Sequence, residues 1–325
     1  MKPRIQVFAL GGTIAMAPRR EGGVGPGLDA DDLLGGVTAW TGDVDLAAET
    51  LFSLPSASLT FAQVAGVAMR ARAAVEAGAA GVVVTQGTDT LEETAFLLDL
   101  LLDLDAPVVV TGAMRAPSQP GPDGPANLVA AIQVAASPAA RGAGVLLVFN
   151  DEIHAARFVT KRHTHKPSAF VSPLAGPIGW IAEGRVRVPL KPATPSPTFA
   201  WPAAGLPEVV LLPGPPDDDG RLLRALLADP PAGVVLQAMG AGHTSRALAP
   251  MLGELSERIP VVLASRVGAG QTLRHTYGFD GSEIDLTRRG LIPAGWLDGP
   301  KARILLALLI AAGADRARII AAFDD

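Results

Sequence analysis

Short apolar runs alternate with longer stretches of helical periodicity over the first 150 residues. Four of these runs are predicted to be buried strands, because each is short, almost continuously apolar and ended by glycine or polar residues. They are 5–10, 81–84, 107–111 and 144–149. A weaker strand is expected at 46–54, and helices at 61–77, from Leu91 and from about Ala126. Apolar strands alternating with helices predict an α/β fold with a parallel sheet covered on both faces.

The pattern changes after Asn150, where a polar segment precedes a predicted hairpin at 178–189. Residues 191–207 contain five prolines and almost no periodicity, so they are predicted to link two domains. A second α/β series follows, with strands expected at 209–212, 234–237 and 260–264 and helices at 222–227, 245–258 and 300–312. The predicted organisation is an N-terminal domain at 1–190, the linker at 191–207 and a C-terminal domain at 208–325.

The stretch 85–90, Thr-Gln-Gly-Thr-Asp-Thr, joins the end of a predicted strand to the start of a predicted helix. In an open parallel sheet such junctions meet in one crevice, where ligands bind. Thr90 followed by Glu93 fits a capping box, which leaves Thr88 and Asp89 available for a site. The simpler alternative is that Thr88, Asp89 and Thr90 only cap the helix.

Four polar residues near predicted strand ends have the chemistry of a nucleophilic site: Thr13, Thr88, Asp89 and Lys161. A threonine hydroxyl is a weak nucleophile and needs a neighbouring base, a role that a lysine amine can serve when Asp89 orients its ammonium form. Backbone N–H groups of the turn at 11–12 and of the helix start near Thr90 are suited to stabilise an oxyanion. This combination indicates acyl transfer through a threonyl ester.

Other chemistries fit the sequence less well. The turn Gly11-Gly12-Thr13 lacks the spacing of a phosphate-binding loop, which disfavours nucleotide binding. His163 and His165 are two positions apart near acidic residues, but solvated loop histidines explain them better than a metal site. The glycine- and proline-rich segment 16–28 is expected to be a mobile surface loop, and one use for such a loop is a lid.

The amino-acid composition further limits the class of protein and the kinds of partner. The 325 residues are 49% hydrophobic and 18% charged, carry a net charge of −5 and include no cysteine. These values exclude a disordered chain, disulfides and thiol chemistry, and they disfavour a nucleic-acid partner. No signal-peptide core precedes the first predicted strand, and no apolar stretch is long and pure enough for a membrane span, so a cytoplasmic location is expected.

Two segments resemble the signatures of the bacterial-type L-asparaginase family. They are Gly11-Gly12-Thr13-Ile14-Ala15 and Gly87-Thr88-Asp89-Thr90, the latter followed by Glu92-Glu93-Thr94-Ala95. Further similar segments span nearly the whole chain: 110–115, Asp123-Gly124 with Asn127, 148–151, 159–161 and 299–303. The resemblance implies a flavodoxin-like doubly wound parallel sheet in the N-terminal domain and a smaller C-terminal α/β domain. It also implies a homotetramer built from dimers, or a homodimer, with no metal or organic cofactor.

Residue by residue, the resemblance makes Thr13 the nucleophile, and Thr88, Lys161 and Asp89 the second catalytic group. It assigns the substrate's α-amino group to Asp89 and its α-carboxylate to Ser56. The other positions expected at the substrate are Gly12, Gly87, Ala113, His243 and Glu283.

The sequence departs from the family at three positions. Residues 16–36 contain no tyrosine, whereas family members commonly have one in the lid loop, and Tyr277 is the only tyrosine in the chain. Tyr277 is therefore a candidate catalytic residue, reaching with Glu283 into the site of a partner subunit; the alternative is a structural tyrosine packed beside Phe279. Gln86 and His243 stand where members often have histidine and asparagine, respectively.

The resemblance implies hydrolysis of L-asparagine to L-aspartate and ammonia through a threonyl acyl-enzyme, with glutamine as a minor substrate. Two alternatives stay open. One is the ammonia-supplying subunit of a tRNA-dependent amidotransferase, against which the acidic charge and the absence of an added N-terminal domain argue. The other is a catalytically dead ligand-binding homologue, supported by the missing lid tyrosine.

Overall fold

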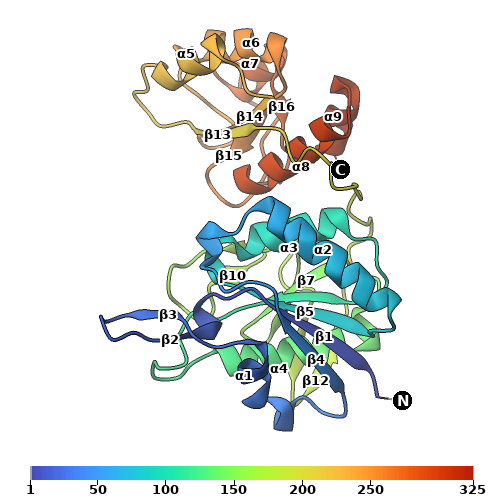
Figure 1. The fold of residues 1–325 in the computed structure, drawn as a ribbon. Helices are drawn as coiled ribbons and strands as arrows, with labels where there is room; N and C mark the ends of the chain where they lie inside the picture. Colours follow the sequence, from blue (N-terminus) through green and yellow to red (C-terminus); the bar gives the residue numbers. More distant parts are fainter. Residues whose placement is uncertain (1, 325) are drawn as a thin grey trace. The chain divides into compact units, whose positions relative to one another are not determined.

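The computed structural model describes residues 2–324. The chain divides into two compact units, one ending at Thr198 and the other beginning at Phe199. This boundary lies within the proline-rich stretch 191–207. Each unit is built on a β-sheet with helices on both faces (Figure 1).

The first unit contains an eight-stranded sheet, in the order β12-β11-β8-β7-β6-β5-β1-β4. The strands are β1 (Arg4–Ala9), β4 (Asp45–Thr50), β5 (Gly81–Thr85), β6 (Val108–Thr111), β7 (Val145–Phe149), β8 (Glu152–Ala155), β11 (Gly179–Ala182) and β12 (Arg185–Arg187). Strands β4, β1, β5, β6 and β7 are parallel to one another. Their order is that of a doubly wound flavodoxin-like sheet, so the predicted fold class is confirmed.

Strand β8 is not predicted by the apolar pattern, which shows only a polar segment after Asn150. Asn150 and Asp151 adopt positive φ angles of 51° and 62°, which these residue types tolerate in tight turns. The chain therefore reverses directly after β7, and β8 pairs antiparallel with it. The predicted hairpin at 178–189 is confirmed as β11 and β12, which also pair antiparallel.

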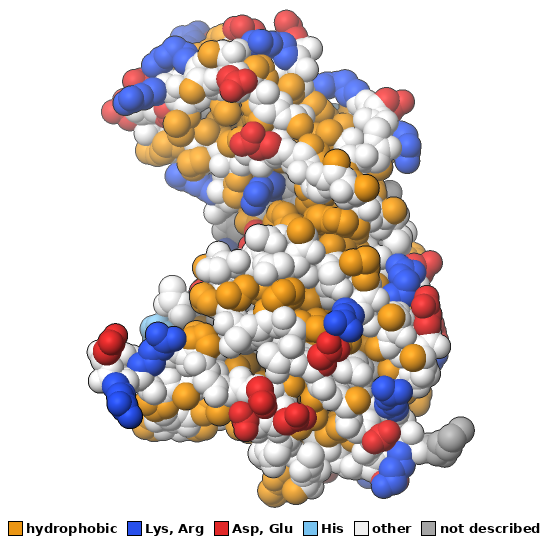
Figure 2. Space-filling view, in the orientation of Figure 1, with side chains coloured by type: hydrophobic (Ala, Val, Ile, Leu, Met, Phe, Trp, Pro, Cys, Tyr) orange, Lys and Arg blue, Asp and Glu red, His pale blue; other side chains and the backbone are white. Residues whose placement is uncertain are grey.

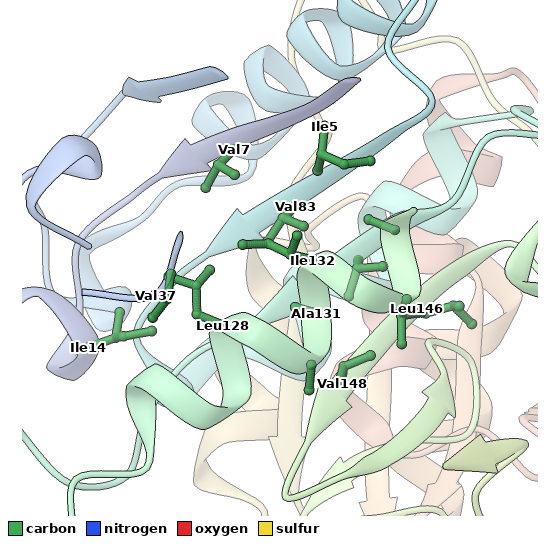
Figure 3. Close-up of a cluster of buried hydrophobic side chains, with 14 of the residues drawn as sticks. Ile5, Val7, Ile14, Val37, Val83, Leu128, Ala131, Ile132, Leu146 and Val148 are labelled. Carbon is green, nitrogen blue, oxygen red and sulfur yellow. The ribbon is translucent and has the colours of Figure 1, made fainter. Parts of the chain in front are cut away.

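Helices cover both faces of this sheet (Figure 1). One face carries α2 (Phe61–Glu76) and α3 (Leu91–Leu101), and the other carries α1 (Ala30–Gly35) and α4 (Gly124–Ala135). Beneath α4, Leu128 and Ile132 pack with Val83, Leu146 and Val148 of the strands in one buried cluster (Figure 3). Because helices lie on both faces, the central strands are apolar at nearly every position.

Helices α2 and α3 start in different ways. Thr60 caps α2 through a capping box with Gln63. The capping box predicted at Thr90 is wrong, because Thr90 occupies the N-cap position of α3 without a capping hydrogen bond from its side chain. Its hydroxyl instead donates to the carbonyl oxygen of Ser56 at 3.1 Å and accepts from Nε2 of Gln86 at 3.1 Å.

The segment predicted as an irregular loop at 16–28 is a short hairpin. Strand β2 (Met16–Pro18) pairs antiparallel with β3 (Val24–Pro26). The residues between them are exposed and include Arg19, Arg20 and Glu21, and charged side chains gather at this end of the molecule (Figure 2).

The second unit has a four-stranded parallel sheet in the order β13-β14-β15-β16. Its elements are β13 (Val209–Pro213), α5 (Arg221–Ala228), β14 (Gly233–Ala238), α6 (Ala249–Arg258), β15 (Val261–Ser265), α7 (Glu283–Arg288), β16 (Ile292–Pro293), α8 (Gly299–Ala311) and α9 (Arg316–Ala322). The three predicted strands and three predicted helices are confirmed. The shorter β16, α7 and α9 lack a detectable period and are not predicted. Within residues 2–324, no helix is both long and apolar enough to cross a membrane.

His154 of β8 is a buried histidine in the first unit, with 1% of its surface exposed. Its Nδ1 lies 2.9 Å from the hydroxyl of Ser172. Its Nε2 is 3.3 Å from an oxygen of Glu152, but in a geometry that forms no hydrogen bond. Burial lowers the pKa of His154 from 6.5 to about 4, so the folded protein holds this ring neutral.

We expect His154 to make the stability of the protein fall on acidification. The folded pKa lies below the unfolded value, so the unfolded chain takes up the proton first, and stability is lost as the pH falls from about 6.5 to about 4. The full loss corresponds to about 3 kcal/mol. Urea unfolding between pH 7 and pH 4.5 should show a shallower decline for His154→Gln than for the wild type. The exposed His165 supplies a control, because His165→Gln should leave the decline unchanged; equal slopes for all three proteins would contradict the expectation.

Candidate active site

Two turns meet at the carboxyl ends of strands β1 and β5. These strands are parallel neighbours, and the N–H of Leu10 donates to the carbonyl of Thr85 at 2.9 Å. Gly12 then adopts φ 82° and ψ −176°, a conformation open essentially to glycine alone. A Cβ atom at Gly12 would lie 2.1 Å from the backbone nitrogen of Gly87. This backbone contact brings together the turns in which Thr13 and Thr88 are the first residues.

Lys161 reaches this place from β9 (Thr160–Lys161), which pairs with β10 (Phe170–Val171). Its Nζ lies 2.9 Å from Oγ1 of Thr88 and 2.8 Å from Oδ1 of Asp89. The lysine side chain is 15% exposed, but Asp89 is 70% exposed, so this ion pair adds little stability in water. The ion pair instead fixes the geometry, because it holds the ammonium group against Thr88. The hydroxyl oxygen of Thr88 accepts this hydrogen bond, so the hydroxyl proton of Thr88 stays available.

In residues 2–324, three hydrogen-bond donors that belong to the two threonines have no partner. Thr13 is half-buried, and within residues 2–324 its hydroxyl has no hydrogen-bond partner. The backbone N–H groups of Thr13 and Thr88 also lack partners in that range, as expected for the first residues of helical turns. Thr88 is only 6% exposed, and unsatisfied N–H groups in buried positions are rare. The two backbone N–H groups are therefore suited to stabilise a bound oxyanion.

Ser56 lies against the same turn. It begins a 3-10 helix, Ser56–Ser58, and is 2% exposed. Its hydroxyl oxygen accepts the backbone N–H of Asp89 at 3.1 Å. Because this bond uses an oxygen lone pair, the hydroxyl proton is left to donate to a ligand.

Two further residues near the site, Glu92 and Asn127, make contacts that the sequence does not predict. Glu92 accepts the backbone N–H of Lys161 through Oε2 at 2.6 Å. Asn127 donates to the carbonyl of Gly112 at 3.0 Å and accepts from the N–H of Asn150 at 3.0 Å, so it supports the turn that precedes Ala113. Both residues occur in the motif segments, but their partners are distant in sequence and no local pattern identifies them.

A second polar cluster lies in the second unit and contains His243, Tyr277 and Glu283. Glu283 is fully buried; its Oε1 accepts the N–H groups of Tyr277 at 2.7 Å and Thr276 at 2.9 Å, and its Oε2 is 3.2 Å from Nε2 of His243. Burial raises the pKa of Glu283, but the two N–H groups and His243 outweigh it and leave the pKa below its usual range. The rings of His243 and Tyr277 meet edge to face, with centroids 4.9 Å apart, and Tyr277 is 43% exposed.

The histidine pair does not form a recognisable metal site. The rings of His163 and His165 meet edge to face, with centroids 4.5 Å apart. Nδ1 of His163 accepts the N–H groups of His165 and Lys166, both at 3.2 Å. In the part of the chain that the structure describes, no group of three or more His, Cys, Asp or Glu side chains is arranged to hold a metal ion.

A flavodoxin-like sheet hosts many unrelated functions, so the fold alone does not decide the family, and comparison with known proteins is needed. The chain matches the family models "Asparaginase, N-terminal" over residues 4–194 and "Glutaminase/Asparaginase C-terminal domain" over residues 208–323. It therefore belongs to the asparaginase family.

Individual relatives agree with this assignment. A probable L-asparaginase of Deinococcus radiodurans is 39% identical over 97% of this chain and 95% of its own length. An L-asparaginase of Bacillus licheniformis is 33% identical over 96% of both chains. The crystal structure of a probable cytoplasmic L-asparaginase from Campylobacter jejuni superimposes with a TM-score of 0.88 at 32% identity and covers all of both chains.

Proposed function

We propose that this protein is an L-asparaginase, which hydrolyses the side-chain amide of L-asparagine to give L-aspartate and ammonia. The observation that carries the proposal is the placement of the Lys161 ammonium group between Thr88 and Asp89, at 2.9 and 2.8 Å. Thr88 and Asp89 directly follow Gly87, which contacts Gly12, and Gly12 directly precedes Thr13. Membership of the asparaginase family supports the same reaction.

In the first half of the proposed reaction, the Thr13 hydroxyl attacks the amide carbon. The carbonyl oxygen becomes an oxyanion, for which the unpaired N–H groups of Thr13 and Thr88 are the nearest suitable donors in the described site. The proton from Thr13 goes to the leaving nitrogen, the C–N bond breaks, and ammonia departs from a threonyl ester.

In the second half, water attacks the ester. A base accepts the water proton, the ester bond breaks, and the proton returned to Thr13 restores its hydroxyl. Thr88 is the proposed first acceptor of the water proton, and Lys161 accepts the Thr88 proton in turn. For this role Lys161 must first release one of its own protons to bulk water, which its pairing with Asp89 opposes.

Substrate binding offers a way to relieve that opposition. We propose that the α-ammonium group of asparagine pairs with the exposed carboxylate of Asp89, while Ser56 donates its free proton to the α-carboxylate. When Asp89 shares its charge with the substrate, the ammonium form of Lys161 loses part of its stabilisation. The substrate's own amino group thereby promotes deprotonation of the lysine.

We propose a cytoplasmic homotetramer or homodimer that needs no metal or organic cofactor. Gly12, Gly87 and Ala113 line the substrate on the first unit. Tyr277, held in the cluster with His243 and Glu283, would act at the site of a partner subunit in place of the lid tyrosine.

We expect Thr13→Ala and Thr88→Ala each to reduce ammonia release from asparagine by roughly 10³-fold or more, because each removes a group that the reaction consumes or returns. Both residues lie on turns, so circular dichroism and the melting temperature should change little. Ser58→Ala, an exposed neighbour of Ser56, is the matched control. Activity within tenfold of the wild type would remove that threonine from the catalytic set. A wild type that releases no ammonia without further partners would instead favour the amidotransferase or inactive alternatives.

Succinamate, which is asparagine without the α-amino group, tests the role of Asp89. We expect its kcat to fall as well as its affinity, because it cannot draw Asp89 away from Lys161. The preference for asparagine over succinamate should be roughly 10- to 100-fold for the wild type and much smaller for Asp89→Asn. A preference that is the same in both proteins would refute the pairing.

Tyr277→Phe keeps the ring and its packing but removes the hydroxyl. If Tyr277 polarises the nucleophile, kcat should fall by roughly 10² with the melting temperature nearly unchanged. A normal kcat combined with a lower melting temperature would show that this tyrosine is structural.

A further inference from the structure

Lys161 is placed by a hairpin that lies outside the main sheet. Strands β9 and β10 contain two residues each and form a separate two-stranded sheet. Such a short pair is not stable by itself. The position of the lysine must therefore depend on contacts that anchor the hairpin to the rest of the unit.

One anchor acts on the backbone of Lys161 itself. Within the hairpin, the N–H of Arg162 donates to the carbonyl of Ala169 at 2.7 Å. Adjacent N–H groups along a strand point to opposite sides, so the N–H of Lys161 faces away from β10. It donates to Oε2 of Glu92 at 2.6 Å.

Glu92 lies in the first turn of α3, directly after the short 3-10 helix Thr88–Thr90. That 3-10 helix supplies Thr88 and Asp89, the two partners of the lysine side chain. The segment 88–92 thus holds Lys161 at both ends, with Glu92 on its backbone nitrogen and Thr88 and Asp89 on its Nζ. A displacement of β9 by about 1 Å would remove the Nζ of Lys161 from hydrogen-bonding range of Thr88, and misplacements of that size cost up to about 100-fold in rate.

We propose that Glu92 is a positioning residue, which fixes Lys161 against Thr88 by accepting the lysine backbone N–H. The kinetic part of this proposal rests on the proposed asparaginase activity, but the structural part does not. What matters is an acceptor oxygen at the end of a side chain of this length, and the negative charge is secondary.

Three variants separate these properties. Glu92→Gln keeps the length and an acceptor oxygen but loses the charge. Glu92→Asp keeps the charge but is one methylene too short to span the distance, and Glu92→Met keeps the length without a comparable acceptor. Glu93→Gln, one position further along the helix, is the control for loss of a glutamate charge.

For each variant, the crystal structure gives the distance from Lys161 Nζ to Thr88 Oγ1, and steady-state kinetics with asparagine give kcat and KM. We expect Glu92→Gln and Glu93→Gln to keep the wild-type distance of 2.9 Å and a kcat within about threefold. Glu92→Asp and Glu92→Met should lose the contact and lower kcat by roughly 10- to 100-fold. KM should change little, because Ser56 and Asp89 are untouched, and a merely structural defect would lower the melting temperature without this split between kcat and KM.

The proposal is overturned if Lys161 keeps its contact with Thr88 in Glu92→Asp and Glu92→Met. It is also overturned if Glu92→Asp is as active as the wild type while Glu92→Gln is not, because the charge would then be the property that matters. If the wild type releases no ammonia from asparagine, the proposed function fails, and the crystal structures alone still decide whether Glu92 positions the lysine.

Discussion

The arrangement of the first unit's site depends on one close contact between two backbones. Gly12 and Gly87 approach so closely that a Cβ atom at Gly12 would overlap the nitrogen of Gly87, and the φ of Gly12 is positive. A side chain there would add strain of roughly 1–3 kcal/mol and would also force the turns after β1 and β5 apart. Without this approach, Thr13 and the group of Thr88, Asp89 and Lys161 would belong to separate surfaces instead of one candidate site.

The charges at this site oppose its proposed chemistry until a ligand arrives. Asp89 and Lys161 form an ion pair at 2.8 Å, whereas the proposed base at Lys161 has to be neutral. Asp89 is nevertheless mostly exposed, so a cationic group from solution has access to it. In the proposed function this arrangement links recognition to catalysis, because a ligand with an α-ammonium group would pair with Asp89 and compete with Lys161 for its carboxylate.

The sequence predicts those features that are encoded locally. The central strands were predictable because helices bury both of their faces, and Thr88 and Asp89 because they follow β5 at the start of a helix. The capping box at Thr90 failed because its hydroxyl has tertiary partners, Ser56 and Gln86. The contact of Glu92 with Lys161 joins residues 69 positions apart. No local period reports such a contact, so it required the folded structure.

The carboxylate of Glu283 contacts the backbone of Tyr277. The sequence predicts Tyr277 as a candidate catalytic residue and Glu283 as a residue at the substrate. In the structure the Glu283 carboxylate is fully buried and already engaged: Oε1 accepts two backbone N–H groups, and Oε2 faces His243. A ligand would have to displace these donors from a carboxylate whose lowered pKa reflects how well they stabilise its charge. Its observed contacts instead fix the backbone of Tyr277, whose ring remains 43% exposed. In this cluster, therefore, the glutamate holds the backbone of the loop, while the rings of Tyr277 and its neighbour Phe279, 43% and 51% exposed, lie at the surface.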